Sequence, residues 1–251
     1  MKTATAFWIA APGSGELRKE VLPPTALGEA RIETLYSGIS RGTERLVFRG
    51  EVPAEERTRM RCPLQQGDLP GPVKYGYAAV GRIESGPVRI EGRTVFCLHP
   101  HQDRFSAPAG MAVLLPPGVP AARAVLGANM ETAVNILWDA GCLPGDRIAV
   151  VGAGVVGLLV ASLAVRIPGT EVTLVDVDPG KRALARHFGC GFALPDEAPE
   201  GCDVVVHASG SPEGLGTALA AAGFEATVVE ASWYGNRTVA VGLGGAFHSR
   251  R

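Results

Sequence analysis

The chain has 251 residues, with 24 Lys or Arg and 25 Asp or Glu, so its formal net charge at pH 7 is −1. This balance gives no electrostatic basis for binding nucleic acid or an anionic membrane surface. The length allows one large domain or two modest ones, and either would have an ample core. The five cysteines are odd in number and never form a C-x-x-C pair, which favours reduced thiols in the cytoplasm over a disulfide framework.

Residues 1–118 predict an all-β region. Short apolar or alternating runs are separated by Gly and Pro, a pattern typical of strands joined by turns. The first of these runs fits a β-strand better than a signal peptide. The segment Gly50–Lys74 is rich in charge, Pro and Gly and is predicted to run over the surface. We expect strands over Thr5–Ile9, Ala30–Tyr36, Ala78–Ile83, Arg93–Leu98 and Met111–Leu115.

From Ala121 onwards, predicted strands and helices alternate, which indicates a parallel sheet covered by helices on both faces. Ligands of such sheets bind at the carboxyl ends of the strands. The expected strands are Arg147–Val151, Val172–Val175, Gly191–Leu194, Asp203–Ala208 and Ala226–Ala231. The expected helices are Ala121–Leu126, Glu131–Ala140, Val155–Arg166, Pro179–Phe188 and Ser211–Ala222.

A glycine pattern follows the first of these parallel strands. Gly152, Gly154 and Gly157 have G-x-G-x-x-G spacing, and Asp176 follows the next strand, 19 residues after the last glycine. A buried strand, a glycine turn, a helix, a second strand and an acid form the dinucleotide-binding fingerprint. A glycine-bearing core unit without ligand and a membrane helix are the alternatives. The membrane alternative is disfavoured by flanking arginines and by three glycines inside the apolar stretch.

Each residue of the fingerprint has a physical role. The first glycine allows the turn, the second lets a pyrophosphate approach the backbone, and the third lets the helix lie against the sheet. The unpaired N–H groups of the first helical turn, at Val155 and Val156, would face the phosphates. Asp176 would accept hydrogen bonds from the adenosine ribose and repel a 2′-phosphate. The pattern therefore predicts NAD(H), with NADP(H) as the alternative.

Several segments together resemble the medium-chain dehydrogenase/reductase family along essentially the whole chain. They are Ser37–Glu44, Tyr75–Gly81, Met130–Val134 and the glycine fingerprint. The resemblance implies a GroES-like β-rich domain, expected over residues 1–122, and a Rossmann NAD-binding domain over residues 123–251. Gly-Ile-Ser-Arg-Gly-Thr-Glu at 38–44 is similar to the bacteriochlorophyllide 3-hydroxyethyl dehydrogenase subgroup.

Relatives in this family continue through a sixth Rossmann strand and closing helices, and in many of them that last strand pairs across a dimer interface. By comparison, this sequence lacks the sixth strand. The resemblance therefore implies an exposed sheet edge at the strand expected around Ala226–Ala231, and a homodimer is one expected partner.

The resemblance also bears on zinc. Zinc-dependent members hold the catalytic metal with a Cys in the first segment and a His in the second, where this chain has Ser40 and Tyr77. A hydroxyl and a phenol do not replace a thiolate and an imidazole. The family's four-cysteine structural lobe is also absent, so we expect a site without zinc. A metal held by His99 and His101 is the alternative, disfavoured by Pro100 and by the lack of further ligands nearby.

Without a Lewis acid, hydride transfer needs a hydroxyl, carboxyl or imidazole to handle one proton. The resemblance places Ser40, Thr43 and Tyr77 in the active-site cleft, although the first two could equally bond turn backbone and the third could pack on the barrel. Glu131 is expected near the nicotinamide, either as part of a proton relay or as a partner of the helix dipole. His101 is the candidate general acid of the histidine cluster.

Four further positions are candidates for contact with the cofactor. Arg41 resembles a family position that reaches the phosphates, and Lys181 resembles one near the ribose. Both could equally be ordinary solvated side chains. Ala208 and Ser209 follow a predicted central strand at its ligand-binding end.

The sequence therefore predicts a zinc-independent oxidoreductase that transfers a hydride between NAD(H) and an alcohol, a ketone or a conjugated carbonyl. The alternative is a non-catalytic nucleotide-binding relative that has lost the zinc ligands and the C-terminus. The expected partner is a small-molecule substrate, with neither nucleic acid nor membrane, and the expected location is the cytoplasm.

Overall fold

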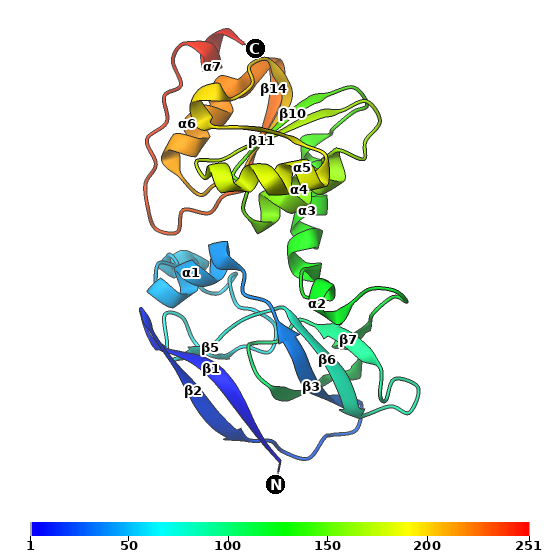
Figure 1. The fold of residues 1–251 in the computed structure, drawn as a ribbon. Helices are drawn as coiled ribbons and strands as arrows, with labels where there is room; N and C mark the ends of the chain where they lie inside the picture. Colours follow the sequence, from blue (N-terminus) through cyan, green and yellow to red (C-terminus); the bar gives the residue numbers. More distant parts are fainter. Residues whose placement is uncertain (1, 251) are drawn as a thin grey trace. The chain divides into compact units, whose positions relative to one another are not determined.

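In the computed structural model, which describes residues 2–250, the chain forms two compact units, Met1–Ala128 and Asn129–Arg251 (Figure 1). The first unit contains two antiparallel sheets, and the second contains one parallel sheet. This confirms the α/β fold class with the β-rich part first. The predicted domain boundary after residue 122 falls within the short helix α2 (Ala121–Ala124).

One sheet of the first unit has the strand order β2-β1-β5-β4 and the other has the order β8-β3-β6-β7-β9. The first sheet consists of β1 (Thr3–Ala11), β2 (Ser14–Val21), β4 (Gln66–Gly67) and β5 (Val73–Lys74). The second consists of β3 (Glu29–Ser37), β6 (Ala79–Ser85), β7 (Thr94–Cys97), β8 (Arg104–Pro108) and β9 (Val113–Leu114). Short 3-10 turns lie at Ala54–Glu56 and Ala109–Met111. Alternate residues of the second sheet, including Ile32, Ile83, Val95 and Phe105, form the core of this unit.

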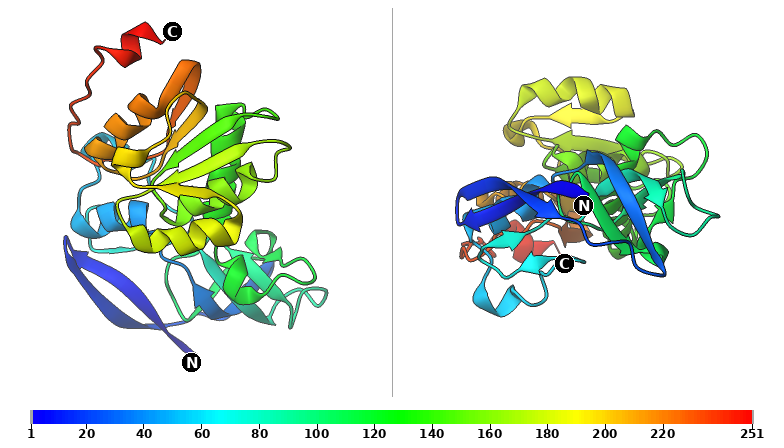
Figure 2. Two further views of the ribbon diagram at one scale, coloured as in Figure 1. Left: turned by 45° about the horizontal axis from the view of Figure 1, so that its top comes forward. Right: turned by 90° about the horizontal axis from the view of Figure 1, so that it is seen from below.

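Residues 1–118 depart from the expected elements at two places: the all-β prediction was wrong at one helix, and one strand was not expected. Residues Arg41–Arg49 form the helix α1, which buries Leu46 and Val47 and ends at Gly50 in the left-handed conformation, with φ +70°. Strand β2 was also missed, because most of its residues are exposed and polar. It pairs with β1 in a long hairpin, drawn in dark blue in Figure 2.

The segment Gly50–Lys74 does not simply run over the surface, as its composition predicted. Its end pairs with β1, and Val73 and Lys74 are both buried. The ammonium group of Lys74 lies 2.8 Å from Glu20 Oε2 and 2.8 Å from Gln102 Oε1. Glu20 also accepts a 2.6 Å hydrogen bond from Trp8 Nε1, so a polar cluster ties this segment to the hairpin.

The sheet of the second unit has the strand order β12-β11-β10-β13-β14. Its strands are β10 (Arg147–Val151), β11 (Glu171–Val175), β12 (Gly191–Ala193), β13 (Cys202–His207) and β14 (Ala222–Glu230). Its helices are α3 (Gly127–Ala140, which begins at the end of the first unit), α4 (Val155–Ala164), α5 (Arg182–Phe188), α6 (Pro212–Ala221) and α7 (Ala246–Ser249), with 3-10 turns at Pro179–Lys181 and Pro195–Glu197.

The order of these strands explains where the helices lie. From β10 the chain moves in one direction through β11 to β12, and then returns to the other side of β10 for β13 and β14. Because parallel crossovers are right-handed, α4 and α5 cover one face of the sheet and α6 covers the other. In the described part of the chain β14 pairs only with β13 and so forms one edge of the sheet.

None of the helices between residues 2 and 250 is long and apolar enough to span a membrane. The apolar stretch that begins at Ile148 is instead split between the buried strand β10, the glycine turn and the ten-residue helix α4.

The buried ammonium of Lys74 should make the free energy of unfolding sensitive to its partner. The Glu20→Ala substitution leaves a 2 % exposed side chain without its counter-charge, so we expect a loss of about 3 kcal/mol. Glu16→Ala, on the same strand, removes only a surface ion pair with Arg18 and should change the free energy by less than about 0.5 kcal/mol. Urea denaturation of the two variants measures the difference, and equal losses would contradict it.

Candidate functional site

The glycine turn of the second unit lies between the ends of three parallel strands. The Gly152 N–H donates a 2.7 Å hydrogen bond to the Val175 carbonyl, and the Ala208 N–H donates one of 2.8 Å to Val151. Gly152 has φ +108°, and a Cβ there would lie 2.6 Å from the backbone nitrogen of Ser209. Only glycine allows this approach, so the turn and the segment that follows β13 lie in direct contact.

The other two glycines differ in what surrounds them. A Cβ at Gly157 would lie 1.9 Å from the Gly152 carbonyl oxygen, so α4 packs onto the turn as closely as glycine permits. A Cβ at Gly154 would meet nothing within 4 Å. Gly154 is the N-cap of α4, whose first N–H groups, at Val155 and Val156, have no partner within the helix. An open backbone at a helix N-terminus fits the pyrophosphate of a dinucleotide.

Asp176 follows β11 and is tied to the turn. Its Oδ2 accepts a 2.7 Å hydrogen bond from the Ala153 N–H, and its Oδ1 accepts one of 2.9 Å from the Asp178 N–H. Each oxygen keeps a second lone pair, so the carboxylate can also accept from ribose hydroxyls. Lys181 lies nearby in the 3-10 turn that follows, with its ammonium group 4.0 Å from Asp178.

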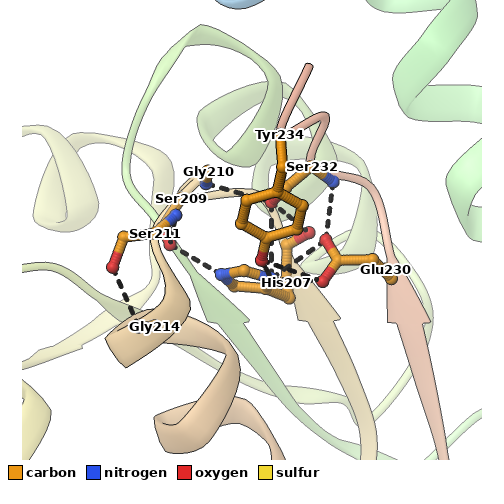
Figure 3. Close-up of polar contacts among 8 residues, drawn as sticks. All are labelled: His207, Ser209, Gly210, Ser211, Gly214, Glu230, Ser232 and Tyr234. Carbon is orange, nitrogen blue, oxygen red and sulfur yellow. Dashed lines mark hydrogen bonds and ion pairs between the residues drawn. The ribbon is translucent and has the colours of Figure 1, made fainter. Parts of the chain in front are cut away.

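At the carboxyl ends of β13 and β14 the structure brings Ser209 into a chain of polar contacts (Figure 3). Its Oγ lies 2.6 Å from His207 Nε2, and His207 Nδ1 lies 2.8 Å from Glu230 Oε2. The imidazole is fully buried, whereas Ser209 and Glu230 are exposed. Tyr234 Oη and Ser232 Oγ lie 3.4 and 3.3 Å from the same Nδ1.

In the first unit, three predicted residues meet at the N-terminus of α1. The side-chain hydroxyl groups of Ser40 and Thr43 lie beside the Tyr77 phenol. Burial raises the pKa of this phenol, the Glu44 carboxylate nearby adds to the rise, and the two hydroxyl groups oppose it. The phenol is therefore a neutral proton donor at physiological pH.

A second chain of contacts lies beside this hydroxyl cluster. His101 Nε2 is 2.6 Å from Glu44 Oε2, and His101 Nδ1 is 2.5 Å from Ser37 Oγ. The other oxygen of Glu44 accepts a 2.7 Å hydrogen bond from the backbone N–H of Ser40. A Cβ at Gly76 would lie 2.9 Å from the His101 ring, so glycine at that position leaves room for the imidazole.

Glu44 and Ser37 were not predicted as site residues, although both lie in the segment that carried the family resemblance. Glu44 lies four residues after the N-cap residue Ser40, one more than in a capping box, yet its carboxylate still accepts from the N-cap backbone. His101 belongs to the predicted set, and the structure shows that both of its ring nitrogens have partners.

Two other predicted residues lie outside these contacts. Arg41 is exposed in the first turn of α1, and Glu131 is exposed on α3, where its carboxylate accepts a hydrogen bond from Asn135.

The alternative of a metal at His99 and His101 does not fit the structure. The His99 ring is buried and stacked on Phe105 with centroids 3.6 Å apart, and its Nδ1 lies 2.8 Å from the Pro100 carbonyl oxygen. Across residues 2–250, no three His, Cys, Asp or Glu side chains are grouped so that they could hold a metal ion. The positions that resemble zinc-ligand positions carry the hydroxyl of Ser40 and the phenol of Tyr77, which lie beside each other.

Curated proteins align with parts of the chain, while no protein-family model matches it. S-(hydroxymethyl)glutathione dehydrogenase from Komagataella pastoris is 40% identical over 62 residues, which are 24% of this chain and 16% of that protein. D-xylulose reductase A from Aspergillus niger is 27% identical over 131 residues, which are 46% of this chain and 37% of that protein. The chain thus spans much less than two thirds of either of these relatives.

Solved structures match almost the whole chain. A thermostable alcohol dehydrogenase from Pyrobaculum aerophilum has a TM-score of 0.78 at 21% identity, covering 96% of this chain and 80% of that one. 2R,3R-butanediol dehydrogenase from Bacillus subtilis has a TM-score of 0.76 at 16% identity, covering 98% of this chain and 82% of that one. Quinone oxidoreductase from Thermus thermophilus has a TM-score of 0.68 at 22% identity, covering 89% of this chain and 72% of that one. Its structure is also known in complex with NADPH. These matches confirm the predicted fold, a GroES-like domain followed by a Rossmann domain.

The buried His99 should make stability fall in mild acid. Burial lowers the pKa of this imidazole from 6.5 to about 4, so between these values the unfolded chain binds the proton more readily than the folded one. Stability is therefore complete above pH 6.5 and falls as the pH drops towards 4. We expect His99 to account for a loss of about 2 to 3 kcal/mol between pH 7 and pH 4.5.

Denaturant unfolding at the two pH values measures this loss. In His99→Gln the difference between the two free energies should shrink by that amount. The matched control is His187→Gln, which removes an exposed histidine and should leave the difference as it is. A His99→Gln variant with the full pH dependence would show that other groups carry the effect.

Proposed function

We propose that this chain is a zinc-independent oxidoreductase of the medium-chain dehydrogenase type that prefers NAD(H). The observation that carries the proposal is the glycine turn. Its backbone is open at Gly154, it lies at a helix N-terminus, and it is hydrogen-bonded to Asp176, which directly follows the neighbouring strand. The dehydrogenases and reductases among the matched proteins support it.

The residues of the second unit would hold the dinucleotide in a defined order. The backbone at Gly152, Gly154 and Gly157 leaves room for the pyrophosphate, and the N–H groups of Val155 and Val156 face it. Asp176 takes the ribose hydroxyls and repels a 2′-phosphate, with Lys181 beside it. Ala208 and Ser209 border the turn, and Arg41 of the first unit is a further phosphate ligand. When bound, the cofactor supplies or accepts the hydride.

Tyr77 is the residue that we propose handles the proton. Its half-buried, neutral phenol can donate a hydrogen bond to a carbonyl oxygen and give that oxygen its proton as the carbonyl is reduced; in the reverse direction the phenolate takes the proton from the alcohol. The hydroxyl groups of Ser40 and Thr43 orient the phenol. The pair of Glu44 and His101 lies next to Ser40 through the backbone and can carry a proton onward.

The side chains at the positions that resemble the family's zinc ligands favour proton transfer from a phenol over catalysis by zinc. Zinc in proteins is held by thiolates, imidazoles and carboxylates, whereas the positions that resemble the family's zinc ligands carry Ser40 and Tyr77. We infer that the substrate is an alcohol/ketone pair or a conjugated carbonyl, and that it is bulky or ring-bearing by resemblance to the bacteriochlorophyllide subgroup. We also propose a cytoplasmic location, Glu131 as a residue near the nicotinamide, and a homodimer formed through the edge of β14.

Cofactor binding is tested first, by titrating the metal-stripped protein with NADH and with NADPH and following tryptophan fluorescence. We expect saturable binding of NADH and much weaker binding of NADPH. In Asp176→Asn one side-chain oxygen still accepts from Ala153 but the charge is lost, so NADPH should gain roughly tenfold relative to NADH.

A second variant, Gly154→Ala, tests the pyrophosphate position. Its new methyl group has open space in the protein alone, so the fold should be unchanged, but the methyl group would stand where a pyrophosphate approaches. Loss of NADH binding in this variant with unchanged unfolding supports the site. A wild-type protein that binds neither cofactor contradicts the proposal, and binding without turnover on a panel of alcohols and ketones would indicate a non-catalytic nucleotide-binding protein.

The role of Tyr77 is tested once a substrate from that panel is turned over. Tyr77→Phe removes the proton donor and should lower kcat by about 100-fold while the Kd for NADH stays the same. Tyr75→Phe is the matched control, because Tyr75 is also buried but donates its hydroxyl hydrogen to the Met60 carbonyl. Equal kcat values for Tyr77→Phe and the wild type would rule out this assignment.

A further inference from the structure

The chain of contacts at His207 has the connectivity of a nucleophilic serine site. A serine hydroxyl, an imidazole and a carboxylate follow one another, with Ser209 Oγ 2.6 Å from Nε2 and Glu230 Oε2 2.8 Å from Nδ1 (Figure 3). Serine nucleophiles are recognised by this geometry, whatever the order of the residues in the sequence. The proposed hydride transfer assigns its proton to Tyr77. It therefore gives no role to the contacts among Ser209, His207 and Glu230.

The hydrogen-bond partners of the His207 imidazole determine which of its ring nitrogens carries the hydrogen. The Glu230 carboxylate only accepts hydrogen bonds, and both of its oxygens lie within 2.9 Å of His207 Nδ1, so Nδ1 carries the hydrogen. In the neutral imidazole Nε2 is then the acceptor, and Ser209 Oγ donates to it. This is the protonation pattern in which an imidazole can take the serine proton as a general base.

The carboxylate that orients the imidazole is itself held in place. The Ser232 N–H donates a 2.7 Å hydrogen bond to Glu230 Oε1, and Tyr234 Oη lies 3.3 Å from Oε2. Burial, together with the Glu230 charge, raises the pKa of Tyr234 to about 12, so the phenol remains a donor at neutral pH. Three hydroxyl groups, those of Ser209, Ser232 and Tyr234, and one carboxylate thus contact the buried imidazole, with no second charged group among the contacts described.

The position of Ser209 suits attack on an external molecule. Ser209 lies between the end of β13 and the start of α6 and is exposed, whereas His207 behind it is fully buried. The Ser211 N–H, at the N-cap of α6, donates a 3.2 Å hydrogen bond to Ser209 Oγ. A negative charge that develops next to Ser209 would thus form beside the positive end of a ten-residue helix.

We propose that Ser209 is a nucleophile that accepts the acyl group of small esters, so that the second unit carries an esterase activity. Ser209 Oγ attacks the ester carbonyl while its proton passes to His207 Nε2. The tetrahedral adduct collapses, the C–O bond to the alcohol breaks, and the alcohol leaves with the proton from His207. Water then attacks the acyl-serine, again giving its proton to Nε2, and the acid leaves as Ser209 is restored. Glu230 stabilises the protonated imidazole in both halves. No oxidant or reductant is needed, and the activity does not depend on the proposed dehydrogenase function.

The probe is p-nitrophenyl acetate, with release of p-nitrophenol followed by absorbance and the modified residue identified by peptide mass. We expect one acetyl group on Ser209 and catalytic turnover above the buffer rate. Ser209→Ala should lower that rate by at least about 100-fold, and Ser209→Cys should retain the acylation step. The matched control is Ser162→Ala, which removes a hydroxyl bonded only to the Leu159 carbonyl on α4.

A second variant keeps the test independent of folding at the buried histidine. Glu230→Gln changes a partly exposed side chain and keeps an acceptor for Nδ1–H, yet removes the charge, so the rate should fall roughly 100-fold. Wild-type rates in Ser209→Ala, acetylation confined to lysines or cysteines, or an unchanged rate in Glu230→Gln would each overturn the proposal. An unfolding curve of Ser209→Ala in urea that matches the wild type would show that the lost esterase rate does not come from a lost fold.

Discussion

The close approach of three backbone segments at the carboxyl edge of the parallel sheet is the constraint on which the second unit depends. Gly157 brings α4 onto the Gly152 carbonyl, and Gly152 brings the turn against Ser209. Neither contact leaves room for a Cβ. As a result the helix N-terminus, the acid after β11 and the serine after β13 share one edge of the sheet, and every candidate ligand contact in this unit follows from that packing.

The candidate site of the first unit consists of hydroxyl groups, and we propose that it transfers a proton. The half-buried phenol of Tyr77 needs neighbouring groups to orient it as a donor. The N-terminus of α1 supplies that orientation through Ser40 and Thr43, and Glu44 connects the same turn to His101. Burial favours the neutral phenol, and the neighbouring hydroxyl groups moderate the effect, so the phenol stays protonated while it remains able to exchange its proton.

The sequence predicted the parts of the fold that periodicity and glycine spacing control. Strand β10 was predicted with its observed bounds, because Arg147 begins an apolar run that the glycine turn ends. Helix α1 was missed because it has nine residues and a glycine in its first turn, which weakens the helical pattern. Strand β2 was missed because most of its residues are exposed and polar, which leaves no alternation of apolar and polar types. Both elements are held by tertiary contacts that a local pattern does not contain.

The polar contacts at His207 show that candidate site residues, too, can depend on tertiary contacts that the sequence pattern does not reveal. The sequence predicted the strand Asp203–Ala208, which contains His207, and placed Ser209 among the residues beside the cofactor. Neither pattern could identify Glu230 as their partner, because that pairing depends on register: His207 lies directly opposite Glu230 where β13 and β14 pair in parallel. The register in turn depends on an irregularity between Cys202 and Val204, which shifts β14 relative to its neighbour. Without that shift the carboxylate would lie elsewhere along the strand, and the imidazole would be buried without the acceptor that sets its protonation.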